Sequence, residues 1–234
     1  MKKRGNGSTW AAELAQMIDH TLLKATATEQ HIATLCTEAV RYGFATVCIH
    51  PVYVPFAAKW LSDTRVGVCT VVGFPLGTNT TGVKSFETGA AIADGADEVD
   101  MVLAVHALKN KRFDQVRSDI AAVVTAAEST PVKVILETCY LSNAEIQRAC
   151  ELAVDAGASF VKTSTGFGSG GATVEHVALM RQTVGEHIGV KASGGIRDEQ
   201  TARAMIQAGA NRLGCSAGVA IVSGVTPDGG PSEY

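Results

Sequence analysis

The chain has 234 residues, of which 46% are hydrophobic and 18% charged, and its formal net charge is −3. This size fits one large domain with a sizeable core, and the weakly acidic balance gives no sign of a surface for nucleic acid or an anionic membrane. No stretch of about 18 apolar residues occurs, so no membrane-spanning helix is expected.

The basic N-terminus and the cysteines predict a reduced, cytoplasmic protein. Lys2-Lys3-Arg4 is followed by polar residues rather than an apolar run, so no signal peptide is expected. No CxxC pair occurs, which argues against a disulfide framework or a metal site. We therefore expect no metal and no cofactor. The six cysteines are Cys36, Cys48, Cys69, Cys139, Cys150 and Cys215.

Along the chain, strand-like segments alternate with segments of helical apolar spacing, which favours parallel βα units. The helix that follows residue 142 has a defined start, because Ser142 and Glu145 form a capping-box pattern and Leu141 and Ile146 suit a hydrophobic staple. The predicted strands are residues 17–23, 44–50, 66–73, 98–104, 132–137, 160–165, 189–193 and 212–216.

A weak internal repeat sets the number of units. Gly43, Gly95, Gly157 and Gly209 each follow a helical segment and precede a strand by a few residues, as the left-handed position after a helix requires. Each interval fits two βα units, since a barrel of about 250 residues holds eight. We predict a single-domain (β/α)8 TIM barrel over residues 1–234, with a polar extension at about 1–10 and a flexible tail at about 225–234. The alternative is a doubly wound open sheet.

Side-chain alternation turns three charged residues toward the barrel interior. In the strand at residue 98, Val99 and Met101 form an outward apolar set, so Asp100 points inward. The same rule turns Lys162 and Lys191 inward from two later strands. All three should therefore meet near the carboxyl ends of the strands, where barrel active sites lie.

Two buried lysines in one cavity predict imine chemistry. Each ammonium disfavours the other, so a lysine pKa is expected to fall toward neutrality. A neutral amine is what Schiff-base formation on a carbonyl substrate requires. A carboxylate such as Asp100 would keep one lysine protonated while the other titrates. The alternative is a buried ion pair without chemistry.

Small residues after consecutive late strands predict a phosphate site beside the lysines. Gly194 and Gly195 follow the Lys191 strand, Ser216 follows the last strand, and Gly166 follows the Lys162 strand. Backbone N–H groups in such loops can approach an anion closely. The alternative is that these glycines serve ordinary tight turns.

Four segments together resemble the deoxyribose-phosphate aldolases, a family of Schiff-base aldolases, and the likeness runs from about residue 14 to 224. The lysine segments, with Lys-Thr-Ser-Thr-Gly and Lys-Ala-Ser-Gly-Gly in this order, are the specific part. The matching segments are Ile18-Asp19-His20-Thr21-Leu22-Leu23-Lys24, Glu98-Val99-Asp100-Met101-Val102, Val161-Lys162-Thr163-Ser164-Thr165-Gly166-Phe167 and Val190-Lys191-Ala192-Ser193-Gly194-Gly195-Ile196-Arg197.

The resemblance implies reversible cleavage of 2-deoxy-D-ribose 5-phosphate to acetaldehyde and D-glyceraldehyde 3-phosphate, without a metal. It assigns the imine to Lys162. Lys191 is implied to lower the Lys162 pKa and to join proton transfer, with Asp100 working with it through water. It places the phosphate on the backbone of Gly194, Gly195 and Ser216. Other Schiff-base aldolases or transaldolases, and a phosphate-binding barrel without catalysis, remain alternatives.

Four further residues bear on this site. Asp19 is a candidate to orient Lys191 or substrate, with a structural hydrogen bond as the alternative. Cys48 has inward parity and is expected to pack beside the substrate cavity. Phe167 stands where some relatives have a phosphate-binding lysine, and Tyr234 matches a C-terminal tyrosine that aids proton transfer in some relatives. Since barrels commonly pair through their outer helices, a homodimer is expected.

Overall fold

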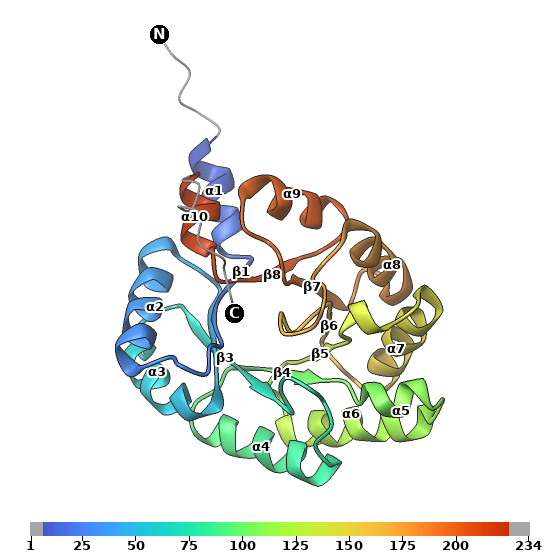
Figure 1. Cartoon of the computed structure of the whole chain (residues 1–234). Coiled ribbons are helices and arrows are strands. Elements are labelled where there is room, and N and C mark those ends of the chain that lie inside the picture. Colours follow the sequence, from blue (N-terminus) through green and yellow to red (C-terminus); the bar gives the residue numbers. More distant parts are fainter. Residues whose placement is uncertain (1–6, 225–234) are drawn as a thin grey trace.

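The strands of this chain close into a barrel in chain order, with every neighbouring pair parallel and β8 paired to β1 (Figure 1). The computed structural model describes residues 7–224. The eight strands are β1 (Ile18–Leu22), β2 (Thr46–Ile49), β3 (Gly67–Val72), β4 (Glu98–Val102), β5 (Val132–Ile135), β6 (Phe160–Lys162), β7 (Gly189–Ser193) and β8 (Arg212–Cys215).

Helices surround the barrel, and α1 packs beside α10 in Figure 1. Two 3₁₀ turns, η1 (Pro51–Tyr53) and η2 (Thr138–Tyr140), follow β2 and β5. The helices of the described chain are α1 (Gly7–Ala15), α2 (Glu29–Tyr42), α3 (Val54–Leu61), α4 (Thr81–Ala93), α5 (Val105–Lys109), α6 (Phe113–Ala127), α7 (Asn143–Asp155), α8 (Val174–Val184), α9 (Glu199–Gln207) and α10 (Gly218–Ser223).

The predicted (β/α)8 barrel is confirmed, with all eight strands inside their expected ranges. The predicted capping box starts α7, since Ser142 and Glu145 satisfy each other's backbone N–H. The four repeat glycines have φ angles of 71° to 113°, which only glycine adopts without strain. Helix α1 begins at Gly7, so it includes the end of the segment that we expected to be a polar extension.

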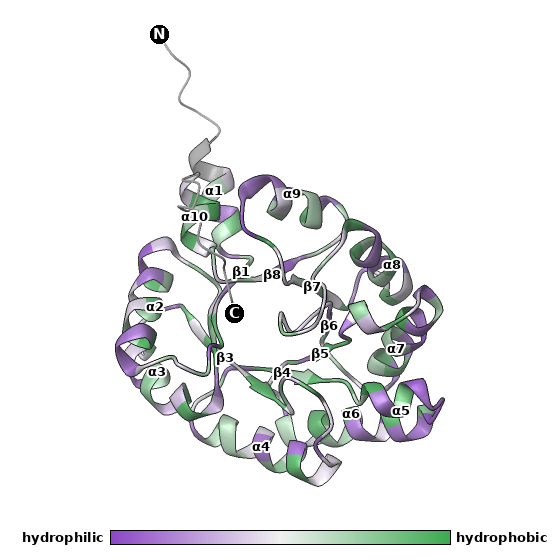
Figure 2. Ribbon diagram, viewed as in Figure 1, coloured by the Kyte–Doolittle hydropathy of each residue, from purple (hydrophilic) through white to green (hydrophobic). Residues whose placement is uncertain are grey.

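The apolar core lies between the barrel and its helices. Outward strand residues such as Val99, Met101, Val161 and Val190 are fully buried in it. The helices carry both colours in Figure 2, as expected of amphipathic helices with one face on the barrel. The polar lumen residues are therefore enclosed by apolar packing on every side of the barrel.

Candidate active site

Asp100, Lys162 and Lys191 meet inside the barrel, as the parity rule predicted. Lys162 and Lys191 are direct register partners on β6 and β7, which aligns their side chains. Asp100 Oδ2 accepts hydrogen bonds from Lys162 Nζ at 2.8 Å and from Lys191 Nζ at 2.7 Å. Asp100 and Lys191 are fully buried, and Lys162 is 2% exposed. Because one oxygen contacts both amines, Asp100 couples their charges directly.

A third buried lysine, Lys133 on β5, completes the cluster and was missed at the sequence level. Its Nζ lies 2.8 Å from Asp100 Oδ1 and 2.6 Å from Glu98 Oε2. The sequence did contain a signal for it. Lys133 stands between Val132 and Val134, so it interrupts an apolar strand, and Lys162 and Lys191 are likewise set in strand sequence. Lys162 and Lys191 also drew attention because glycine-rich loops follow them at the mouth of the site. No such motif follows Lys133, which lies away from the mouth.

The same contacts continue through β1 and β8 and close on themselves. Lys191 Nζ forms an ion pair with Asp19 Oδ2 at 2.5 Å, and Asp19 Oδ1 accepts from Arg212 Nη1 at 2.7 Å. Arg212 Nη2 then reaches Glu98 Oε1 at 3.0 Å. The result is a closed ring of alternating charge, Glu98–Lys133–Asp100–Lys191–Asp19–Arg212, which we call the charge ring. Asp19 thus contacts Lys191, and its role in orienting that lysine stays a prediction.

The charge ring is balanced without Lys162. Its three carboxylates face three cations, and Lys162 joins it only through Asp100 among the described residues. With Lys162 counted as an ammonium ion, the cluster holds four cations and three carboxylates. Lys162 is thus the lysine of the cluster that the ring does not need for its charge balance.

Electrostatics keep Asp100 and Lys191 ionised. Burial alone would raise the pKa of Asp100, but Lys133, Lys162 and Lys191 together lower it well below its usual range. Burial alone would lower the pKa of Lys191, yet Asp100 and Asp19 raise it well above the usual value. Of the two lysines, Lys191 therefore fits the one that a carboxylate keeps protonated, because Asp100 and Asp19 outweigh the neighbouring ammonium groups.

The predicted phosphate-binding glycines gather at the carboxyl end of the barrel. Gly166, Gly194 and Gly195 follow β6 and β7 with φ angles of 90°, 87° and 82°. The two loops touch, since a Cβ added at Gly171 would lie 2.2 Å from Gly194 O. Ser216 follows β8 directly. The backbone that resembles a phosphate cradle is thus assembled from adjacent strands, above the lysines.

Cys48 is fully buried and packs in the lumen with Cys69 and Leu23, as its parity predicted. Its hydrogen bond with Cys69 lowers the pKa of the thiol, against the raising effect of burial. Phe167 lies at the mouth, 46% exposed, with its ring edge-on to Phe74. Tyr234 lies outside the described residues.

Two groups of potential metal ligands lie close together in the described chain: Cys48, Cys69 and Asp100, and Asp19, Cys69 and Glu98. Each carboxylate in them already pairs with at least one lysine or arginine. A divalent cation would have to displace those cations and would meet the remaining positive charges. The donor set therefore suits ion pairing better than metal binding.

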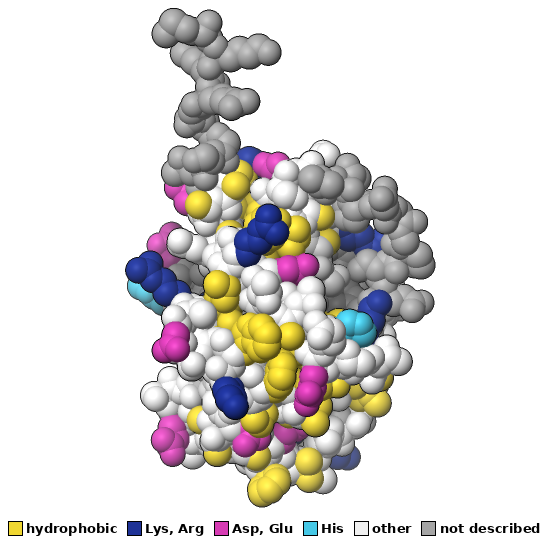
Figure 3. All heavy atoms as spheres, turned by 90° about the vertical axis from the view of Figure 1, so that its left-hand side faces the viewer, with side chains coloured by type: hydrophobic (Ala, Val, Ile, Leu, Met, Phe, Trp, Pro, Cys, Tyr) yellow, Lys and Arg dark blue, Asp and Glu magenta, His cyan; other side chains and the backbone are white. Residues whose placement is uncertain are grey.

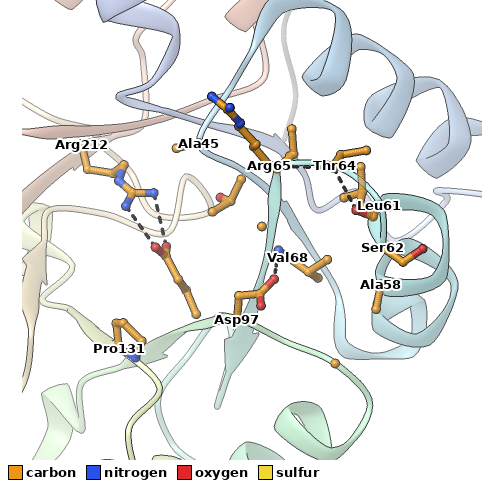
Figure 4. Close-up of a pocket in the computed structure, with 15 residues that line it drawn as sticks. Ala45, Ala58, Leu61, Ser62, Thr64, Arg65, Val68, Asp97, Pro131 and Arg212 are labelled. Carbon is orange, nitrogen blue, oxygen red and sulfur yellow. Dashed lines mark hydrogen bonds and ion pairs between the residues drawn. The ribbon is translucent and has the colours of Figure 1, made fainter.

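The opposite, N-terminal face of the barrel holds a separate cavity of about 490 Å³. The first residues of four strands line it: Thr46, Gly67, Glu98 and Arg212. Figure 4 shows Arg212 at this cavity, where its Nη2 donates a hydrogen bond to Glu98 Oε1. One edge of the charge ring is thus open to solvent on the face away from the glycine loops, with the side chains of Arg212 and Glu98 16% and 14% exposed.

Comparison with protein families gives a match over nearly the whole chain. The model of the DeoC/LacD family aldolases matches residues 13–224. A deoxyribose-phosphate aldolase of Exiguobacterium sp. (strain ATCC BAA-1283 / AT1b) is 62% identical over 223 residues, which is 95% of this chain and 100% of that protein. That of Shouchella clausii is 59% identical over 222 residues, covering 94% and 99%.

A solved structure agrees with the fold. The tetrameric deoxyribose phosphate aldolase of Aeropyrum pernix superimposes with a TM-score of 0.86 at 33% identity, covering 91% of each chain. Within residues 7–224, no helix combines the length and apolar character needed to cross a membrane.

Proposed function

This chain belongs to the DeoC/LacD family of aldolases, and from that premise we propose that it cleaves 2-deoxy-D-ribose 5-phosphate through an imine on Lys162. The chain is a deoxyribose-phosphate aldolase, a carbon–carbon lyase, by its identity of 59–62% to the relatives above. The observation that supports the lysine assignment is the position of Lys162, the one lysine of the buried cluster outside the balanced charge ring.

Lys162 acts as the nucleophile in the proposed mechanism. Its neutral amine adds to the C1 aldehyde of the open-chain sugar, and loss of water gives an iminium ion. Asp100, which contacts Lys162 Nζ directly, is placed to take up and return protons during addition and dehydration. Lys191 stays protonated beside Lys162 and holds Asp100 in position.

The iminium then serves as the electron sink for bond cleavage. A base removes the C3 hydroxyl proton, the C2–C3 bond breaks, and its electron pair moves to the iminium nitrogen as an enamine forms. This step releases D-glyceraldehyde 3-phosphate. Protonation of the enamine at C2 and addition of water then free acetaldehyde and regenerate Lys162. The steps are reversible, so the enamine also attacks glyceraldehyde 3-phosphate in synthesis.

The substrate assignment is tested by the donor that the enzyme accepts. With glyceraldehyde 3-phosphate as acceptor, we expect product from acetaldehyde and none from dihydroxyacetone, because the family's enamine carries two carbons. Product formation by gas or liquid chromatography gives the answer. Preference for dihydroxyacetone would favour another Schiff-base aldolase or a transaldolase, and binding without turnover would favour a non-catalytic barrel.

The phosphate is proposed to lie on the backbone of Gly166, Gly194, Gly195 and Ser216. Gly194→Ala combines a left-handed φ with a Cβ placed 2.8 Å from Gly171 Cα, so the loop must shift. We expect KM for the phosphorylated sugar to rise about tenfold, with a smaller change for unphosphorylated deoxyribose. Gly185→Ala is the matched control, since Gly185 has a φ of 70° with no neighbour within 4 Å at the end of α8. Equal effects in both variants would argue against the cradle.

The cellular context is a further part of the proposal. The six cysteines are free and mostly buried, which is consistent with the cytoplasm, and the reaction suits catabolism of deoxyribose phosphate.

A homodimer is proposed through the outer helices. Figure 3 shows hydrophobic side chains on the α2–α3 side, and three exposed ones there are Val40, Val52 and Trp60. Light scattering measures the mass of the assembly directly.

A further inference from the structure

We propose that Arg212 and Glu98, on the face of the barrel opposite the glycine loops, are positioning residues that set the pH range in which Lys162 forms its imine. The inference rests on the proposed function and extends it to two residues that touch no substrate. It assigns to the N-terminal cavity a role as a second access point to the catalytic charges.

Contact distances connect this pair to the reacting amine along two arms. On one arm Glu98 contacts Lys133 at 2.6 Å, and Lys133 contacts Asp100 at 2.8 Å. On the other arm Arg212 contacts Asp19 at 2.7 Å, Asp19 contacts Lys191 at 2.5 Å, and Lys191 contacts Asp100 at 2.7 Å. Both arms end on the carboxylate that binds Lys162, so a change in either arm reaches it through ionised groups.

The sign of each effect follows from charge balance. Removing the Arg212 cation leaves the ring with one excess negative charge, which a protonated Lys162 would compensate. Removing the Glu98 charge leaves one excess positive charge, which disfavours a protonated Lys162. Buried charges are weakly screened by salt, so these effects persist over the several ångströms between the ring edge and Lys162.

Other ionisable groups near Asp100 could also contribute to the measured pH profile. Besides the six ring members, the thiols of Cys48 and Cys69 lie in the lumen, and Cys69 Sγ is 3.2 Å from Asp100 Oδ1. Burial raises the pKa of Cys69 well above its usual value, whereas the hydrogen bond with Cys69 lowers that of Cys48. A Cys48→Ser background therefore separates thiol titration from the effect of the ring.

The N-terminal cavity gives small molecules a route from solvent to Arg212. Arg212 lines a space of about 490 Å³, and Thr46, on the same wall, has a buried hydroxyl oxygen with no hydrogen-bond partner. A small planar cation can therefore reach the position of the guanidinium group from solvent when the arginine side chain is shortened. Arg65 lines the same cavity, is exposed and forms no ion pair among the described residues, so Arg65→Met is the matched control.

The test is the pH profile of imine formation, recorded as borohydride-trapped adduct on Lys162 after brief exposure to acetaldehyde. Arg212→Met should move the rising limb to higher pH and Glu98→Gln should move it to lower pH, each by about one unit. The double variant should return toward the wild-type profile, because its ring is balanced again. Arg65→Met should leave the profile in place.

Chemical rescue gives a second reading. In Arg212→Ala, guanidinium ion below denaturing concentrations should restore the wild-type profile, whereas urea, a neutral molecule of the same shape, should not. Shifts in the same direction for both single variants, or additive damage in the double variant, would overturn the inference and assign the pair to stability alone. If wild-type Lys162 forms no adduct, the proposed function fails instead, so the two failures are distinguishable.

Discussion

Replacing Lys162 by methionine is expected to lower kcat for cleavage of deoxyribose 5-phosphate by roughly 10⁴-fold or more, because the covalent route then has no nucleophile. The fold should survive this change. Methionine has nearly the length of lysine, and the charge ring that remains is balanced. We therefore expect a melting temperature equal to or above that of the wild type.

Steady-state kinetics and thermal unfolding measured together check this result. Lys109→Met is the control, because Lys109 is 42% exposed and pairs with Glu145 on the outer surface, away from the barrel. Substantial activity in Lys162→Met would move the nucleophile to Lys133 or Lys191. A large loss of stability would contradict the view that Lys162 is the surplus charge.

Asp100→Asn is expected to damage both stability and catalysis. Asp100 contacts Lys133, Lys162 and Lys191, and an amide in its place leaves these cations one anion short. Removing one partner from a buried ion pair costs about 3–5 kcal/mol, and loss of a proton-transfer group costs about 10²–10⁴-fold in rate. Urea unfolding and kcat measurements test the two effects separately.

The pH dependence of unfolding identifies the charge as the cause. The pKa of Asp100 is lowered in the folded state by the three lysines, against burial, while an unfolded aspartate titrates near about pH 4. The carboxylate therefore contributes its full stability above about pH 5, and loses it as the pH falls through 4 toward the folded-state pKa. In Asp100→Asn this acid-linked loss should be shallower, and an unchanged slope would count against the ionised cluster.

The sequence was informative about which strand side chains point into the barrel, because side chains alternate between the two faces of a strand. Alternation around Val99 and Met101 turned Asp100 inward, and the same rule brought Lys162 and Lys191 to it. The repeat of helix-ending glycines predicted eight units because left-handed backbone is costly for other residues. Both rules are local, so a single chain displays them without tertiary information.

The charge ring was not predictable in the same way. Glu98 begins β4 and Arg212 begins β8, so the two residues are far apart in the sequence. Only closure of the barrel brings them together. The parity rule also left open which lysine a carboxylate keeps protonated, since the high pKa of Lys191 depends on its contacts with Asp100 and Asp19. Closure and register are tertiary properties, and they determine the electrostatics of this site.

The most direct test of the account is borohydride reduction of the wild-type enzyme with deoxyribose 5-phosphate or acetaldehyde, followed by peptide mass mapping. We predict a single reduced adduct on Lys162, absent from Lys162→Met. An adduct on Lys133 or Lys191, whose contacts with carboxylates hold them as ammonium ions, would contradict the assignment of the nucleophile. Turnover without any adduct would contradict the imine mechanism itself.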